Sequence, residues 1–133
     1  MVASSQRDNH RPKLAVDGNP ATAWMTKAEG VGQTITMHFK SPATITSVSI
    51  LNGDGMDLEH YQADNRVRTM RMTLGDGTAQ VLSFADKIEM QRFAVEHRVL
   101  TETVHFEILS VFKGKKNNWT AISEIAFNRG ASN

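Results

Sequence analysis

Cysteine is absent from this 133-residue chain, and neither sign of charge predominates. Without cysteine, the protein has no disulfides, no thiolate metal ligands and no cysteine nucleophile. Fifteen Lys and Arg residues stand against 14 Asp and Glu residues, which gives a net charge of +1. Nucleic-acid-binding proteins usually carry a larger basic excess. We therefore expect no nucleic-acid partner.

Long apolar runs are also missing, because no stretch approaches the roughly 20 apolar residues that span a bilayer. Residues 1–5 have neither the basic region nor the apolar region of a signal peptide. The length fits a single domain over residues 1–133. If the protein is exported, this chain is a mature form or a module of a larger protein, and we then expect an extracellular or periplasmic location.

Apolar residues recur mostly at every second position, which is typical of strands with one buried face. Four runs show this spacing: Ile35, Met37 and Phe39; Met70, Met72 and Leu74; Val104, Phe106 and Ile108; Ile125 and Phe127. Residues 43–51 and 79–84 are also rich in strand-forming types, whereas residues 86–98 fit either a short helix or a strand.

Glycine and proline clusters separate these runs, and Gly75-Asp76-Gly77 predicts a hairpin between residues 70–74 and 79–84. Seven or eight short strands in one domain predict an all-β fold, an antiparallel β-sandwich or jelly roll. Residues 6–13 and 52–65 are too long for tight turns, and loops of that length in a compact domain are often functional.

One short segment places several oxygen-bearing side chains together. Asp17, Asn19 and Thr22 lie within six residues, where Gly18 and Pro20 favour a turn. Calcium prefers six to eight oxygen ligands, and Glu124 is a candidate for a remote carboxylate. The alternative is a simple turn closed by its own Asp and Asn side chains, followed by Trp24 in the core.

Three stretches are informative in combination, namely Ala3-Ser4-Ser5, Ala15-Val16-Asp17-Gly18-Asn19-Pro20-Ala21-Thr22-Ala23-Trp24 and Ile122-Ser123-Glu124-Ile125. Together they resemble the discoidin, or coagulation-factor type C, superfamily. Further stretches, Asn52-Gly53, Asn65-Arg66-Val67 and Val111-Phe112-Lys113-Gly114, are similar to the glycan-binding domain found beside bacterial NAD-glycohydrolase toxins. This resemblance implies a galactose-binding-domain-like jelly roll. It also implies a structural calcium ion held by Asp17, Thr22 and Glu124, with Asn19 between them.

Sugar recognition needs an aromatic face for the ring and planar polar groups for the hydroxyls. Trp119 lies in a loop rich in Lys and Asn, and Tyr61 lies beside His60 in the loop of residues 52–65. In related sugar-binding modules these loops meet at one end of the sandwich. The resemblance therefore predicts this ligand-binding set: Trp119, Tyr61, His60 and Arg66, with Asn65 and Asn117 as secondary contacts.

Each of these residues also has a structural alternative. Trp119 would then cap the core, Tyr61 would pack under its own loop, His60 would be solvated, and Asn65 and Arg66 would close the loop.

No motif of a hydrolase, zinc protease or P-loop enzyme is present. The resemblance therefore implies a non-catalytic carbohydrate-binding module, bacterial and secreted, that targets or attaches a larger protein to a glycan or polysaccharide. The alternative is a discoidin-type domain that docks onto a protein or a lipid surface. The loop tips are mainly polar, with Met56 and Leu58 as their apolar candidates, so we expect membrane binding to be the less favoured function.

Overall fold

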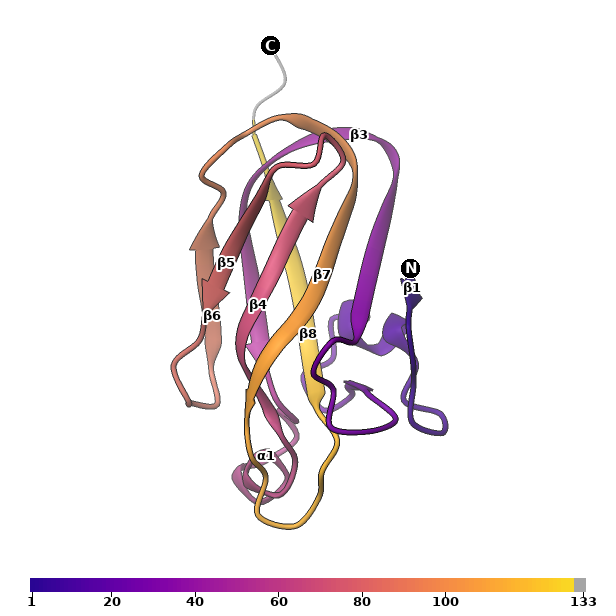
Figure 1. Cartoon of the computed structure of the whole chain (residues 1–133), viewed down its shortest axis with the longest axis vertical. Coiled ribbons are helices and arrows are strands. Elements are labelled where there is room, and N and C mark those ends of the chain that lie inside the picture. The colour runs from indigo at the N-terminus through magenta and orange to yellow at the C-terminus, as the bar shows by residue number, and fades with distance from the viewer. Residues whose placement is uncertain (131–133) are drawn as a thin grey trace.

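A computed structural model describes residues 1–130 of the chain. The elements are β1 (Val2–Ala3), the 3-10 helix η1 (Pro12–Val16), β2 (Trp24–Met25), β3 (Thr34–Asn52), α1 (Leu58–Ala63), β4 (Arg66–Leu74), β5 (Ala79–Ser83), β6 (Met90–Ala94), β7 (Leu100–Phe112) and β8 (Ala121–Arg129). These strands form an antiparallel β-sandwich with a jelly-roll architecture (Figure 1), as the sequence predicts.

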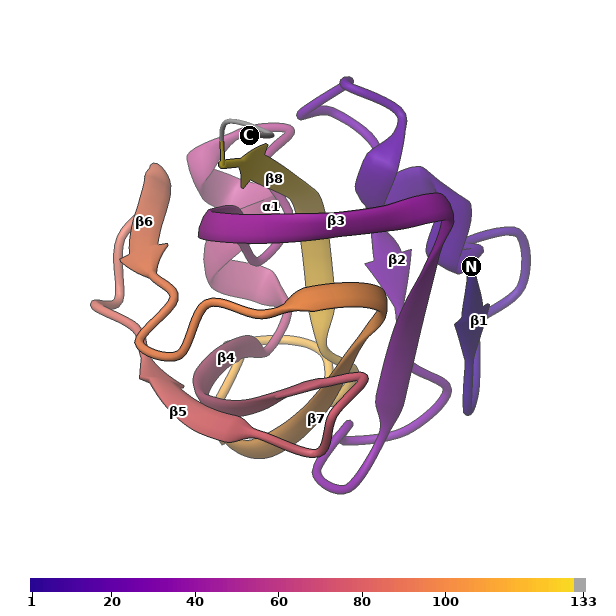
Figure 2. The same ribbon diagram turned by 90° about the horizontal axis from the view of Figure 1, so that it is seen from above.

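The two layers of the sandwich share strand β3. One layer contains β1, the first half of β3, β7, β4 and β5, and the other contains β2, β8, the second half of β3 and β6. Figure 2, which looks down the long axis, shows β3 passing from one layer to the other. The pairing register shifts between His38 and Ala43. Pro42 lies at this irregularity, where the missing N–H of proline is tolerated.

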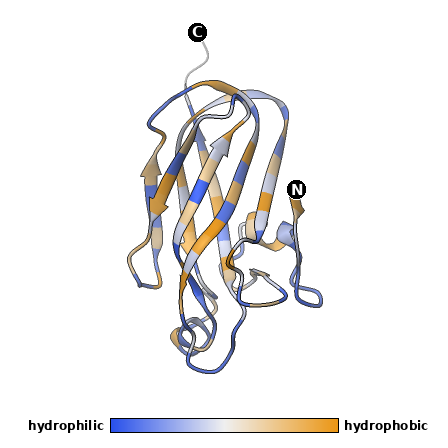
Figure 3. Ribbon diagram, viewed as in Figure 1, coloured by the Kyte–Doolittle hydropathy of each residue, from blue (hydrophilic) through white to orange (hydrophobic). Residues whose placement is uncertain are grey.

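The core lies between the layers and is built by alternate residues of the strands. Met70, Met72 and Leu74 of β4 are buried, as are Val104, Phe106 and Ile108 of β7. In β3, Ile35 is buried, and Met37 and Phe39 pack against the core from its edge. The predicted alternation is therefore confirmed, and Figure 3 shows apolar and polar residues alternating along the strands. Residues 90–94, left open by the sequence, form strand β6.

The loop end is the end of the sandwich that carries α1 and the β7–β8 loop (Figure 1). Helix α1 begins after Asp57, whose side chain accepts a hydrogen bond from the His60 backbone N–H at 2.8 Å. This interaction satisfies one of the free N–H groups at the start of a helix. Within residues 1–130, no helix is long and apolar enough to span a membrane.

Candidate functional site

A cavity of about 410 Å³ lies at the loop end and is named here the Trp119 cavity. Its wall combines three segments that are distant in the sequence, namely the N-terminal segment, the β3–α1 connection with α1, and the β7–β8 loop. The lining residues are Arg7, Asp8, His10, Ala21, Ala23, Met25, Asp54, Met56, His60, Asp64, Asn117 and Trp119. Two loops that the sequence indicates as functional, residues 6–13 and 52–65, therefore both reach this cavity.

The indole of Trp119 forms one wall of the cavity. It packs against a small apolar cluster of Ala23, Met25 and Ala121. The guanidinium carbon of Arg7 lies 3.5 Å from the centroid of the indole, within the range of a cation–π interaction. The indole Nε1 is buried and has no hydrogen-bond partner among the described residues. The ring therefore lies outside the main core, and Arg7 covers one of its faces.

Two buried carboxylates and an amide form the polar wall. The side chains of Asp54 and Asp64 belong to residues that are only 5% and 4% exposed. Asp54 accepts a hydrogen bond from the Met56 backbone N–H at 3.1 Å, and Asp64 accepts one from Asn117 Nδ2 at 2.8 Å. Burial raises the pKa of Asp54, because the charged carboxylate loses water. The wall therefore offers hydrogen-bond acceptors that are poorly solvated.

Two histidines complete the polar lining. His60 Nδ1 lies 2.7 Å from Asp57 Oδ1, and hydrogen bonding to this carboxylate raises the pKa of His60. His10 Nδ1 lies 3.3 Å from the Ala23 carbonyl oxygen. A carbonyl can only accept a hydrogen bond, so His10 Nδ1 carries the proton in that contact. In both rings Nε2 has no partner among residues 1–130 and is free to contact a bound molecule.

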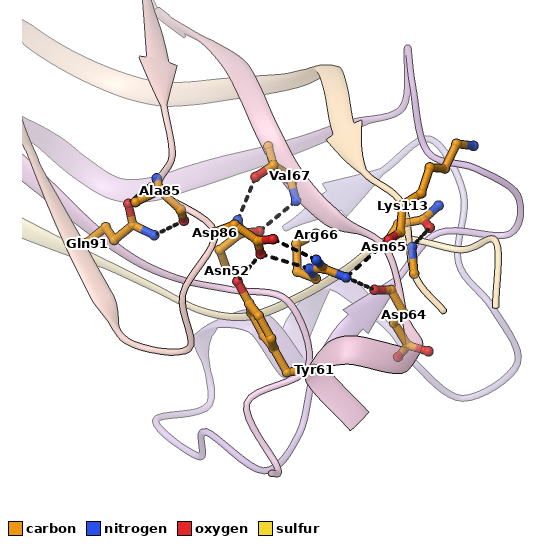
Figure 4. A network of polar contacts seen from close by, with 11 residues as sticks. Asn52, Tyr61, Asp64, Asn65, Arg66, Val67, Ala85, Asp86, Gln91 and Lys113 are labelled. Carbon is orange, nitrogen blue, oxygen red and sulfur yellow. Dashed lines mark hydrogen bonds and ion pairs between the residues drawn. The ribbon is translucent and has the colours of Figure 1, made fainter. Parts of the chain in front are cut away.

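Tyr61 and Arg66 lie at a second cavity, of about 450 Å³, which we name the Arg66 cavity. Arg66 donates through Nε and Nη2 to the Asp86 carboxylate at 3.1 and 2.8 Å (Figure 4). Its Nη1 donates to the carbonyl oxygens of Asp64 and Lys113 at 3.2 and 3.3 Å. Arg66 therefore joins three loops through four hydrogen bonds.

The Tyr61 hydroxyl donates to the same Asp86 carboxylate at 2.8 Å, and the ring of this buried residue lies beside the Arg66 guanidinium. Burial and this hydrogen bond raise the pKa of Tyr61. Hydrogen bonds from Arg66 lower the pKa of Asp86. The three side chains form a structural network under the Arg66 cavity.

Asn65 lines neither cavity. It is fully buried, and its Oδ1 accepts a hydrogen bond from the Gly114 backbone N–H at 2.8 Å. Its Nδ2 donates to Asn118 Oδ1 at 3.1 Å. These bonds fix the β7–β8 loop to the start of β4, so Asn65 positions the loop that carries Asn117 and Trp119.

The structure thus brings together three of the six predicted ligand residues, Trp119, His60 and Asn117. Tyr61 and Arg66 face the Arg66 cavity instead. Helix α1 separates Tyr61 from His60, because consecutive helical residues point about 100° apart. Arg66 lies beyond the helix, at the start of β4. Sequence reasoning missed the cavity residues Arg7, Asp8, His10, Asp54 and Asp64. The length of their loops was the only signal, and it does not identify which loop residues point inward.

The predicted calcium residues lie together in the structure. Asp17 accepts hydrogen bonds from the Asn19 backbone N–H at 2.9 Å and from the Thr22 hydroxyl. The Glu124 carboxylate accepts one from the Gly18 backbone N–H at 3.0 Å. Burial and the adjacent negative charge of Asp17 raise the pKa of Glu124. Two carboxylates, a hydroxyl and an amide oxygen therefore belong to this turn and to the adjacent strand β8, and oxygen donors of these kinds suit calcium. The Asn19 amide oxygen accepts from the Ala21 backbone N–H at 3.0 Å, so the turn is also closed by its own Asp and Asn side chains.

Comparisons with known proteins find one matching family model and several similar solved structures. One family model, described as the NAD glycohydrolase translocation F5/8 type C domain, matches residues 1–128. No curated protein sequence matches the chain.

Three similar solved structures are carbohydrate-binding modules (CBMs) of family 32. CBM32-3 of a family 31 glycoside hydrolase from Clostridium perfringens has a TM-score of 0.79, with 14% identity over 98% of this chain and 89% of that one. The family 32 CBM of C. perfringens NanJ, in complex with galactose, has a TM-score of 0.73, with 14% identity over 95% and 90% of the two chains.

The CBM32 of AlyQ, in complex with 4,5-unsaturated mannuronic acid, has a TM-score of 0.68, with 19% identity over 96% of this chain and 92% of that one. At these identities the similarity to solved structures shows a common fold. The family model covers nearly all of the described sequence, and on that ground this chain belongs to the NAD glycohydrolase translocation F5/8 type C domain family.

Proposed function

We propose that this chain is a non-catalytic glycan-binding module and that the Trp119 cavity is its sugar site. The observation that carries this proposal is the convergence of an indole, two buried carboxylates, an amide and two imidazoles in one cavity at the loop end. Sugar hydroxyls both donate and accept hydrogen bonds, so a wall with donors and acceptors suits them. The sugar is bound and released unchanged.

Proteins with the same fold support the proposal. The NanJ module was solved with galactose, and the AlyQ module with an unsaturated mannuronic acid. The C. perfringens CBM32-3 comes from a glycoside hydrolase. By analogy with these modules, we propose that the present domain attaches a larger protein to a glycan.

The charges of the cavity favour an uncharged sugar over a carboxylated one. Its wall contains the carboxylates of Asp8, Asp54 and Asp64 against the single permanent positive charge of Arg7. Asp54 and Asp64 are buried, and charges are screened less effectively away from solvent. A uronic acid brought into this cavity meets more repulsion than attraction. In this respect the cavity fits a neutral sugar such as galactose better than it fits a mannuronic acid.

The test is binding of a glycan array, followed by titration of the protein with neutral methyl glycosides and with the matching uronic acids. We expect dissociation constants in the high micromolar to millimolar range for neutral sugars and weaker binding of the uronic acids. His60→Ala is expected to weaken binding about fivefold, because a neutral hydrogen bond contributes about 1 kcal/mol.

The matched control is His97→Ala. His97 is also exposed, but it belongs to the β6–β7 connection at the opposite end of the sandwich (Figure 1). This variant is expected to bind like the wild type. Equal losses in both variants, or tighter binding of the uronic acids, would contradict the proposed site.

Docking onto a protein or a lipid is the second candidate function. Met56 and Leu58, at the start of α1, are 53% and 56% exposed. Two apolar side chains make a small patch compared with those that mark docking surfaces, so the sugar site is favoured. Binding of the wild type to phosphatidylserine vesicles, lost in Leu58→Ser, would support this alternative instead.

We also propose that the turn of residues 17–22 binds a structural calcium ion together with Glu124. Burial, and after it the adjacent charge of Asp17, raises the pKa of Glu124, and a cation beside these two carboxylates would relieve both effects. Among the described residues, no group of three or more His, Cys, Asp or Glu side chains is placed to hold a metal. The proposed site has two carboxylates, so its remaining ligands would be neutral oxygens. With only two carboxylates, we expect a modest affinity.

Chelation of calcium is expected to lower the melting temperature of the calcium-loaded protein. With free calcium tenfold above its dissociation constant, binding stabilises the fold by about 1.4 kcal/mol, or roughly 5 °C for a domain of this size. Differential scanning calorimetry with and without EDTA measures this shift. Asp17→Asn should abolish it, whereas Asp76→Asn, at a turn where Asp76 likewise accepts from a threonine hydroxyl, should not. A melting curve insensitive to EDTA would remove calcium from the proposal.

A further inference from the structure

Arg7 is the least explained side chain of the Trp119 cavity. A guanidinium carries five N–H donors in one plane, yet none of them donates a hydrogen bond to another residue within 1–130. Its guanidinium carbon lies 3.5 Å from the centroid of the Trp119 ring. Arg7 therefore lies flat on the indole, with the donors at its edge unused. The indole thus fixes the orientation of the guanidinium, while its N–H groups remain available to a bound molecule.

The main chain at Arg7 is held firmly. Its backbone N–H donates to the Met25 carbonyl oxygen at 2.8 Å, and its own carbonyl accepts from the His10 N–H at 2.8 Å. Just before it, the Ser5 carbonyl oxygen accepts from the indole Nε1 of Trp24 at 2.9 Å. Asp8 has a φ of +47°, in the left-handed region that a non-glycine residue seldom adopts. A tight turn of residues 7–10 thus presents the Arg7 side chain to the cavity.

The same contact changes the role of Trp119. Carbohydrate stacking needs an open aromatic face, but the guanidinium occupies a face of this indole, and the ring also packs on Ala23, Met25 and Ala121. A sugar that enters the cavity therefore meets the edge of Arg7 before it meets the face of the indole. The same cavity is lined by the acceptors of the buried Asp54 and Asp64.

We propose that Arg7, held flat by Trp119, is the specificity-determining donor of the site and binds two adjacent hydroxyl oxygens of an uncharged pyranose. Trp119 then serves as the platform for Arg7 rather than as the stacking surface for the sugar. The planar fork of a guanidinium matches two neighbouring acceptors, which a lysine ammonium does not. Each bound hydroxyl also donates its proton to a carboxylate of the polar wall. This inference rests on the proposed function, because it deepens the description of the same site.

The test compares Arg7→Met and Arg7→Lys with Arg11→Met, a change at a nearby exposed arginine outside the cavity. The probes are the methyl glycosides of galactose, glucose, mannose and N-acetylglucosamine, titrated by two-dimensional NMR, followed by monodeoxy analogues of the one that binds best. Arg7→Met is expected to weaken binding about tenfold or more, because hydrogen bonds to a charged group are stronger than neutral ones. Arg7→Lys should recover only part of this loss.

Two further readouts separate this role from a structural one. Wild-type protein should discriminate against the two analogues that lack the contacted hydroxyls, and Arg7→Met should lose that discrimination while its melting temperature stays unchanged. Trp119→Phe, which keeps a flat ring under the guanidinium, should retain most of the affinity.

Each contrary result has a distinct meaning. Equal or tighter binding by Arg7→Met would show that Arg7 merely covers the indole, which overturns this inference and leaves the proposed function standing. Loss of binding in Arg11→Met to the same extent as in Arg7→Met would also overturn it. If the wild type binds none of the four glycosides and no glycan on the array, the proposed function fails, and the role of Arg7 fails with it.

Discussion

Replacing Gly53 by alanine is expected to lower the melting temperature by about 10 °C or more, through about 3 kcal/mol or more of lost stability. Gly53 has a φ of +79°, which an L side chain seldom adopts. An added Cβ would also lie 2.7 Å from the Tyr61 ring carbons Cδ2 and Cε2 and 2.7 Å from Arg66 Cγ. The ring is buried and tied to Asp86, so it has little room to move.

The matched control for this change is Gly77→Ala. Gly77 has a φ of +90°, but a Cβ added there meets no other atom within 4 Å. This variant isolates the backbone cost, about 1–2 kcal/mol, so the difference between the two variants measures the crowding under α1. Thermal or urea unfolding followed by circular dichroism gives both values. Equal losses in the two variants would contradict the packing described for Gly53.

Gly53→Ala should also weaken glycan binding, because Gly53 lies beside Asp54 and beneath the helix that carries His60. Its backbone N–H donates to the Ala121 carbonyl oxygen at 3.0 Å, and its carbonyl accepts from the Ser123 hydroxyl at 2.8 Å. A shift of this residue is therefore transmitted to both sides of the Trp119 cavity. Gly77→Ala, in the β4–β5 hairpin, should leave binding unchanged.

The second large effect is expected for Arg66→Met, which should cost about 2–3 kcal/mol of folding stability. Methionine keeps the apolar stem but removes four hydrogen bonds, two to Asp86 and two to the carbonyl oxygens of Asp64 and Lys113. The Arg66 side chain is 9% exposed and that of Asp86 is 39% exposed. We therefore place the cost below that of breaking a fully buried pair, because solvent screens Asp86.

The loss in Arg66→Met should depend on pH. Arg66 lowers the pKa of Asp86, so the ion pair stabilises the fold fully above the ordinary carboxyl pKa of about 4. This contribution disappears as the pH falls through the depressed pKa of the folded state. A double-mutant cycle with Asp86→Asn, measured by urea unfolding at pH 7 and at low pH, tests this directly. A coupling energy of zero at pH 7 would contradict the role assigned to the pair.

Much of the fold was predictable because the alternation of apolar and polar residues along a strand has a direct physical cause. Residues such as Met70, Met72 and Leu74 must share one face of a strand, and the structure buries all three. Ser41 and Pro42 separate the apolar runs of residues 35–39 and 43–51, yet β3 continues through them. Serine and proline favour a break locally, but pairing with β7 on one side and with β8 on the other keeps the chain extended.

The site was less predictable, for reasons that particular residues illustrate. Helix α1 directs His60 and Tyr61 to different cavities, and a helix of six residues leaves too weak a periodic pattern to be recognised. Arg7 and Asp54 lie more than 40 positions apart in loops without periodicity. Their proximity depends on the tertiary fold, which local sequence does not encode. The position of Trp119 in a loop was predictable, but the contact of the Arg7 guanidinium with its ring was not.

Strand β3 has a mechanical consequence. Because one unbroken segment of 19 residues belongs to both layers, the layers cannot slide past each other without tearing hydrogen bonds in both at once. Shear between them is therefore resisted by covalent continuity as well as by side-chain packing. Under the proposed function, a tether that pulls on a bound glycan would load a rigid body, so the weak step under tension would be the escape of the sugar rather than deformation of the domain.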